Sequence, residues 1–152
     1  MSVTMPQTQV PLTESGLLST RPVWLVAILA TLAGAVATEA FALVARAAGV
    51  PMEAAGPGAE EAAEIPVGGF FGGVVFWSVA GVVLAVALAR WAGRPARTFT
   101  VTTVALTALS LAGPAAAPHT ATSTRIVLAA AHVVAAAVIV PLLARRLAHV
   151  RR

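Results

Sequence analysis

The sequence of 152 residues contains no cysteine, tyrosine, aspartate or lysine, and only 11% of its residues are charged. The absence of cysteine excludes disulfide bonds, thiolate catalysis and metal sites with cysteine ligands. Hydrophobic residues make up 59% of the chain, and its mean hydropathy is +0.89. A water-soluble globule of this size cannot cover so much apolar surface with so few polar residues. The composition therefore indicates an integral membrane protein.

The few charged residues are mainly basic: the chain contains ten arginines and six glutamates, and the sequence pI is about 11.6. A nucleic-acid-binding protein needs such residues clustered on a solvent-exposed folded surface. Here the arginines lie at the ends of apolar runs. We therefore expect a lipid bilayer as the partner and no nucleic acid.

Four apolar runs follow a polar segment at residues 1–20, which we expect to be a flexible tail. About 20 helical residues cross a hydrocarbon core about 30 Å thick. The polar leader and the length of the first run do not fit a secretory signal, so the first span is expected to remain attached. The sequence predicts an all-α membrane bundle of four helices, arranged as two helical hairpins. Its domain covers residues 21–146, with spans at 22–46, 67–90, 98–117 and 125–144, and a basic tail follows at 147–152.

Arginine placement predicts the orientation of the bundle, because basic residues beside a span resist translocation. Eight of the ten arginines fall on the side that holds both chain ends. The opposite side receives only Arg46 and Arg125, together with a group of glutamates between the first two spans: Glu53, Glu60, Glu61 and Glu64. Both termini are therefore expected in the cytoplasm, and the protein in the cytoplasmic membrane of a bacterium.

Two ionisable residues, Glu39 and His132, lie inside apolar runs, where a charge is costly. Glu39 lies seven residues before Arg46, and His132 lies seven residues after Arg125. Both should therefore lie about 10 Å below the outer surface. We expect them to face each other in a buried polar layer in the outer half of the bundle. The other members of this candidate site are Ser78, Thr107 and Ser110.

Other interpretations remain open for both residues. Glu39 could reach Arg46 on the same helix face, or it could lie at the headgroups of a thinned bilayer. A neutral His132 could donate a hydrogen bond to a threonine or to a backbone carbonyl. His119, His132 and Glu39 form only a weak metal site, because the ligands are scattered and one lies in a loop. We expect no metal and no cofactor, and the lack of phosphate-loop, HExxH and GxSxG motifs indicates a protein that is not an enzyme.

The second span begins with the glycine-rich sequence GGFFGG. Gly68 and Gly72 are four residues apart, as are Gly69 and Gly73, and this spacing allows helices to approach closely in lipid. Gly81 belongs to a further stripe of small residues. We expect helix packing at Gly68, Gly72, Gly73 and Gly81, and a loose, glycine-rich helix start is the alternative.

The second half of the chain resembles a known family. It contains the runs RPARTFTVTTVALTALSLAGP and RIVLAAAHVVAAAVIVPLLAR, separated by a threonine-rich turn. The spacing of Gly113, Pro114, His132 and Pro141 is similar to that in a family of small four-helix membrane proteins from actinobacteria, classed as a domain of unknown function. The resemblance covers about residues 22–146. It implies a four-helix membrane protein, and it brings no activity, cofactor or site residue with it.

Two functions fit these observations. The first is a non-enzymatic membrane module whose polar layer fixes the register of the helices and whose loops or tail contact a partner. The alternative is a small transporter or ligand-binding protein that uses Glu39 and His132 for proton-linked binding. Four spans seldom build a complete alternating-access path, so the alternative would require a homo-oligomer.

Overall fold

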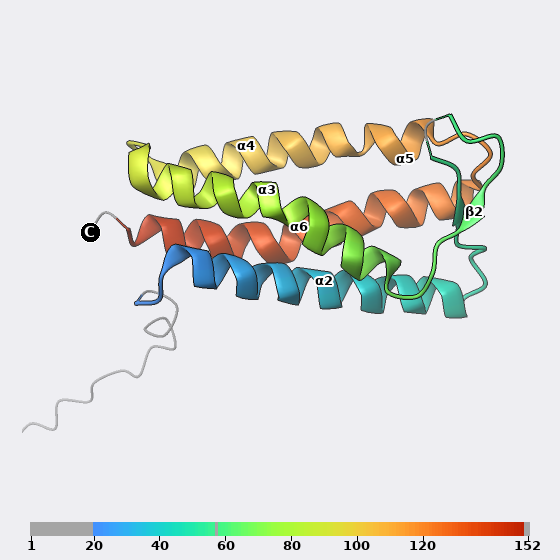
Figure 1. The fold of residues 1–152 in the computed structure, drawn as a ribbon, viewed down its shortest axis with the longest axis horizontal. Coiled ribbons are helices and arrows are strands. Elements are labelled where there is room, and N and C mark those ends of the chain that lie inside the picture. Colours follow the sequence, from blue (N-terminus) through green and yellow to red (C-terminus); the bar gives the residue numbers. More distant parts are fainter. Residues whose placement is uncertain (1–19, 57, 151–152) are drawn as a thin grey trace, which may run out of the picture.

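Four long helices form an all-α bundle in the computed structural model, which describes residues 20–56 and 58–150 (Figure 1). This architecture confirms the predicted fold class. The expected tail at 1–20 lies outside the described residues apart from Thr20, and so do the last two residues of the chain. The helices are α2 (Val23–Ala47), α3 (Gly69–Trp91), α4 (Pro95–Ser110) and α6 (Thr122–Ala148), and a short helix α5 (Ala112–Ala116) extends α4.

Each of the four is long and apolar enough to cross a membrane when α4 and α5 are counted as one span, Pro95–Ala116. This span begins before the expected residue 98, because Pro95 occupies the first helical position, where its missing N–H would have no helical partner. α6 extends beyond the expected 125–144 at both ends. Leu147 belongs to its last turn and is fully buried, so the start of the expected basic tail packs on the bundle.

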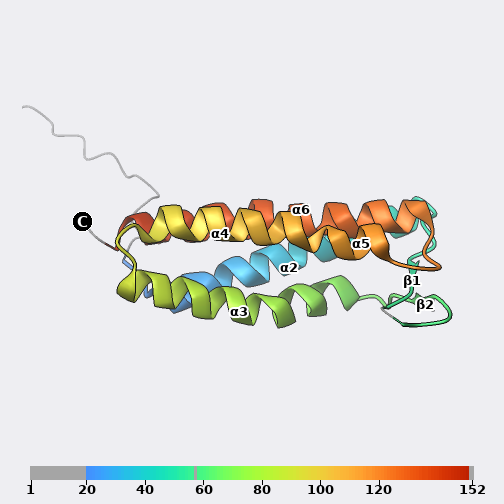
Figure 2. The same cartoon turned by 90° about the horizontal axis from the view of Figure 1, so that it is seen from above.

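α2 is the most buried of the four spans. It packs along α6 and along α3, while α4 packs mainly on α6 and contacts α3 only weakly. Figure 2 shows α3 on the opposite side from the α4–α6 pair. Figure 1 shows both the start of α2 and the end of α6 at one end of the bundle, which we call the terminal end.

The burial of α2 follows from a face of small residues. Its buried residues recur every three or four positions, as one face of a helix requires: Val26, Ala27, Ala30, Thr31, Gly34, Ala35, Thr38 and Ala42. The Thr38 hydroxyl donates a hydrogen bond of 2.7 Å to the Gly34 carbonyl, so this polar group is satisfied within its own helix. Small side chains let the backbones of α6 and α3 approach α2 closely.

The opposite end, which we call the hairpin end, is covered by the segment between α2 and α3. This segment contains a short antiparallel pair, β1 (Glu53–Ala54) and β2 (Ala63–Glu64). Met52 precedes β1, has a φ of 53° and is fully buried. It packs with Ala42, Phe70, Val127 and Ala131 in a hydrophobic cluster at this end. The segment is therefore part of the folded core and not only a solvated acidic loop.

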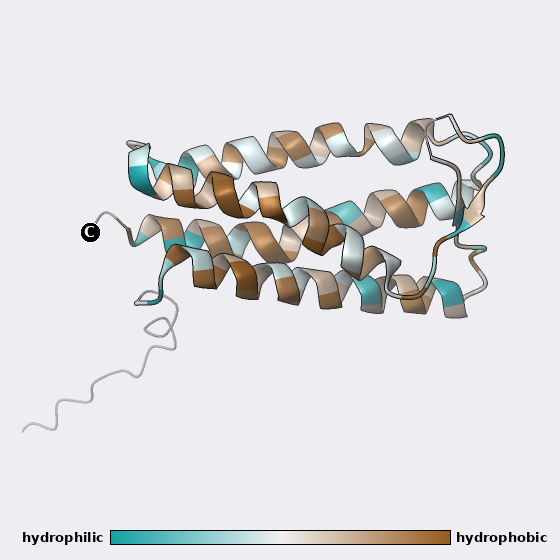
Figure 3. Ribbon diagram, in the orientation of Figure 1, coloured by the Kyte–Doolittle hydropathy of each residue, from teal (hydrophilic) through white to brown (hydrophobic). Residues whose placement is uncertain are grey.

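A second hydrophobic cluster lies nearer the terminal end. It contains residues from all four long helices: Val26, Ala27, Ala30, Ala85, Phe99, Leu143 and Leu147. Figure 3 shows apolar residues along the lengths of the helices and hydrophilic residues mainly near both ends and in the hairpin segment. Large apolar side chains also face outward, such as Trp77, which is 76% exposed. This surface indicates a lipid bilayer environment.

Candidate functional site

Glu39 binds the start of α3 with both oxygens of its carboxylate. The Gly68 N–H donates a hydrogen bond of 2.7 Å to Oε1, and the Phe71 N–H donates one of 2.9 Å to Oε2. Gly68 is the N-cap residue of α3, and Phe71 lies in the first turn of this helix. We call this arrangement the Glu39 cap. It joins the second half of α2 to the start of α3.

The sequence around Gly68 explains why a distant carboxylate takes this position. The first N–H groups of a helix have no acceptor within the helix, and a serine, threonine, asparagine or aspartate at the N-cap usually supplies one. Gly68 has no side chain to do so, and its φ of 87° is a left-handed conformation that glycine adopts readily. Glu39 supplies the missing acceptors from α2. Its negative charge also interacts favourably with the positive end of the helix dipole.

Arg46 connects the end of α2 to the hairpin segment. Its Nη1 donates a hydrogen bond of 3.1 Å to Glu64 Oε1, and its Nη2 donates one to the Ile65 carbonyl. Arg46 is therefore bonded to the hairpin segment, and within the described residues it has no hydrogen bond to Glu39. The hairpin segment is held on its other side by Thr120, whose hydroxyl accepts a hydrogen bond of 3.1 Å from the Ala55 N–H.

His132 lies exposed on α6. Its Nδ1 is 2.7 Å from the Leu128 carbonyl oxygen one turn earlier, and it donates a hydrogen bond because a carbonyl can only accept. Within residues 20–56 and 58–150, no hydrogen bond joins His132 to Glu39. Each residue instead has a backbone partner of its own, and the expected facing pair stays a prediction. For His132 this is the backbone-carbonyl interpretation that the sequence left open.

The three hydroxyl residues of the candidate site lie on two helices. Within α4, the Thr107 hydroxyl donates to the Thr103 carbonyl at 2.8 Å, and the Ser110 hydroxyl donates to the Thr107 carbonyl at 2.7 Å. Ser78 is half-buried and lines a small groove of about 160 Å³ between α2 and α3. In the described part of the chain, none of the three forms a hydrogen bond with Glu39 or His132.

The glycine in closest contact with another helix is Gly34, which is not one of the four glycines expected to pack. An ideal Cβ at any of the four expected positions would meet no atom within 4 Å: Gly68, Gly72, Gly73 and Gly81. A Cβ at Gly34 would instead lie 2.6 Å from Cγ1 of Ile139 on α6. Gly34 is thus the closest helix contact among the described glycines. Its sequence signal was the spacing of Ala30, Gly34 and Thr38, which are each four residues apart.

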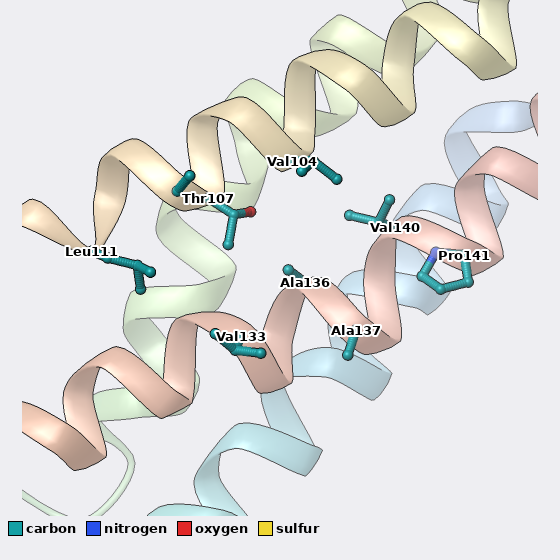
Figure 4. Close-up of a pocket in the computed structure, with 9 residues that line it drawn as sticks. Val104, Thr107, Leu111, Val133, Ala136, Ala137, Val140 and Pro141 are labelled. Atoms are coloured by element: carbon teal, nitrogen blue, oxygen red, sulfur yellow. The ribbon is translucent and has the colours of Figure 1, made fainter.

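A larger groove lies between α4 and α6 and has a volume of about 440 Å³ (Figure 4). Val104 and Thr107 border it from α4, Leu111 borders it from the junction between α4 and α5, and Val133 and Val140 border it from α6. The only side-chain hydroxyl in its lining belongs to Thr107, which donates to its own helix. We call this feature the α4–α6 groove. It is an apolar surface that opens between two membrane spans.

Within the described residues, no group of three histidine, cysteine, aspartate or glutamate side chains is placed to hold a metal ion. Sequence reasoning missed Phe71 and named Gly68 only for helix packing, whereas both residues are backbone donors of the Glu39 cap. Backbone groups carry no residue-type signal. A glycine-rich helix start without a capping side chain is the one feature that could have pointed to them.

The four long apolar helices and the polar contacts at their ends define a multi-pass helical membrane protein. Residues 18–149 match the model of a family of unknown function (DUF6069), and the chain belongs to this family. The match confirms the resemblance to an uncharacterised family. Neither the curated proteins nor the solved structures gave a match.

Proposed function

We propose that the protein is a non-enzymatic membrane module with a polar layer in the half of the bundle nearer the hairpin end. Glu39 is the centre of this layer. The observation that supports the proposal is the Glu39 cap, in which each carboxylate oxygen accepts one backbone N–H of α3. The role of the layer is to fix the register of α2 against α3.

The cap also bears on the proton-linked alternative. A carboxylate that binds protons or substrate in each cycle would have to release the Gly68 and Phe71 amides, and the start of α3 would lose its acceptors. Such a mechanism would also need His132, which bonds its own helix and faces outward. A second copy of the chain would have to complete the site. The structural role requires none of these rearrangements.

The test is the replacement of His132 by alanine in the full-length protein, reconstituted in lipid nanodiscs. Because His132 is exposed and bonds only its own helix, we expect the free energy of unfolding to change by less than about 0.5 kcal/mol. We also expect the difference in stability from the parent protein to be the same at pH 5 and at pH 8. His119→Ala, in the exposed loop before α6, is the matched control. A folded His132→Ala protein with a pH dependence clearly different from that of His119→Ala would favour proton-linked binding.

We further propose that both chain ends lie in the cytoplasm and that the protein resides in the cytoplasmic membrane of a bacterium. The supporting observation is that Arg21, Arg90, Arg94, Arg97 and Arg145 belong to the terminal end, where basic residues resist translocation. The hairpin end carries the glutamates of the hairpin segment. Its Arg46 is bonded to one of them, Glu64.

The absence of native cysteine permits a direct test of this orientation. Ala59→Cys places a thiol in the exposed hairpin segment, and Ala148→Cys places one at the exposed end of α6. In intact cells, we expect a membrane-impermeant maleimide to label the first variant and not the second, which should react only after the membrane is opened. The reverse labelling pattern would show that the bundle is inserted the other way round.

A further inference from the structure

We propose that the α4–α6 groove is a binding site for an anionic phospholipid of the bilayer. One acyl chain lies in the groove, and the phosphate lies between Arg97 and Arg145 at the terminal end. The proposal does not depend on the Glu39 cap, which lies on α2 and α3. It concerns the opposite side of α6 from α2.

The groove has the properties that an acyl chain needs. It lies between two spans, has a volume of about 440 Å³ and is lined almost entirely by apolar side chains. Ala136 and Ala137 on α6 keep it wide, because their side chains are only methyl groups (Figure 4). Ala108 on α4 does the same from the other side of the groove. The Thr107 hydroxyl already has an acceptor in the Thr103 carbonyl. A hydrocarbon chain can therefore fill the groove without leaving a polar group unsatisfied.

Two arginines continue the lining faces of the groove toward the terminal end. Arg97 lies seven residues before Val104, which places it on the same face of α4 about 10 Å away along the helix. Arg145 lies four residues after Pro141, on the same face of α6 and about 6 Å away. Both side chains are exposed. Within residues 20–56 and 58–150, neither side chain has a hydrogen bond or an ion pair.

The positive charge at the terminal end of the bundle favours a lipid with an anionic headgroup. Guanidinium groups bind phosphate through paired, charge-assisted hydrogen bonds, and basic pockets between spans bind anionic headgroups. At the hairpin end, by contrast, Arg46 is already bonded to Glu64. The positive charge beside the groove is thus unneutralised within the described residues, and a negative lipid complements it.

Charge also argues against a second copy of the chain as the occupant. Two copies that share one membrane orientation and pack through this face are related by an axis along the membrane normal. Their Arg97 and Arg145 side chains would then meet at the same depth, and like charges at short range repel each other. An anionic lipid removes this repulsion, whereas a protein partner with the same face adds to it.

The test measures lipid binding to the full-length protein in detergent micelles by native mass spectrometry. The probes are phosphatidylglycerol and phosphatidylcholine with identical acyl chains. We expect phosphatidylglycerol to bind more tightly. Arg97→Gln and Arg145→Gln should each lower its affinity about fivefold (about 1 kcal/mol), and the double variant about 25-fold. Arg21→Gln, an exposed arginine at the start of α2, is the matched control and should leave the affinity unchanged.

A second pair of variants tests the groove itself. Ala108→Phe fills the groove, whereas Ala105→Phe changes an exposed alanine on the same helix that does not line it. We expect the first to weaken the binding of both lipids and the second to change neither. Equal affinity for the two lipids, or arginine variants that match the Arg21→Gln control, would overturn the proposal. So would competition by glycerol phosphate without acyl chains, which would indicate a free-phosphate site, or a dimer that Ala108→Phe dissociates.

Discussion

Replacing Glu39 with alanine is expected to lower the free energy of unfolding by about 3 kcal/mol or more. The carboxylate accepts two hydrogen bonds from α3, and a hydrogen bond to a charged group contributes about 1.5 to 3 kcal/mol. Alanine would remove both bonds and leave the Gly68 and Phe71 N–H groups without a protein acceptor. Chemical denaturation of the full-length protein in mixed micelles, followed by circular dichroism, measures the loss.

Two further substitutions separate the cap from a general effect of charge. Glu39→Gln keeps one carbonyl oxygen as an acceptor, so we expect it to lose about half as much stability as alanine. Glu61→Ala removes an exposed glutamate of the hairpin segment and should change stability by less than about 0.5 kcal/mol. Hydrogen exchange at the Gly68 and Phe71 amides should speed up only in the Glu39 variants. Unchanged exchange at these two amides in Glu39→Ala would contradict the cap.

A double-mutant cycle tests whether Glu39 and His132 interact. Because they have separate backbone partners, the effects of Glu39→Ala and His132→Ala should add to within about 0.5 kcal/mol. A larger coupling energy would mean that the two residues share a network. That result would support the contact between Glu39 and His132 that their equal depth below the outer membrane surface predicts.

The four spans could be predicted because their lengths reflect the thickness of the bilayer and depend little on tertiary contacts. Depth is a one-dimensional property, and counting residues from Arg46 gives it for Glu39. The partner of Glu39 could not be obtained in this way. Its neighbours depend on how α2 is rotated and on which helix packs beside it, and neither follows from residue counting.

The burial of Met52 at the hairpin end shows the same limit. Met52 belongs to a segment that is rich in glutamate and glycine, and nothing in the local sequence marks it as fully buried. It becomes buried only because the segment folds back over the helix ends, where Thr120 bonds the Ala55 N–H. Contacts between residues far apart in the sequence decide this geometry. A pattern within one segment cannot reveal them.

The sequence contained a helix-packing pattern around Gly34, but the high alanine content of the chain made this pattern hard to recognise. Ala30, Gly34 and Thr38 have the spacing of a helix-packing face, but alanine is so frequent in this chain that small residues occur on every face. The GGFFGG sequence was more conspicuous, yet a Cβ at Gly68, Gly72 or Gly73 would meet no atom within 4 Å. What distinguishes Gly34 is the position of Ile139 on α6, which only the folded bundle provides.

Gly34→Leu is therefore expected to lower the free energy of unfolding by about 3 kcal/mol, the upper part of the usual range for overpacking. A Cβ at this position would lie 2.6 Å from Cγ1 and 2.7 Å from Cδ1 of Ile139. Carbon atoms in contact prefer a separation of about 3.5 to 4.0 Å, so Ile139 would have to leave its rotamer or α2 and α6 would have to move apart. The same denaturation experiment in mixed micelles measures this change.

The matched control is Gly81→Leu on α3, where a Cβ would meet no atom within 4 Å. We expect this variant to be at least as stable as the parent, because leucine favours a helix by up to about 1 kcal/mol over glycine. Shortening Ile139 to alanine should recover part of the stability lost in Gly34→Leu, because it removes the two clashing carbons. Equal losses in Gly34→Leu and Gly81→Leu, with no recovery by Ile139→Ala, would mean that the α2–α6 contact does not limit packing and that α3 is covered by another protein surface.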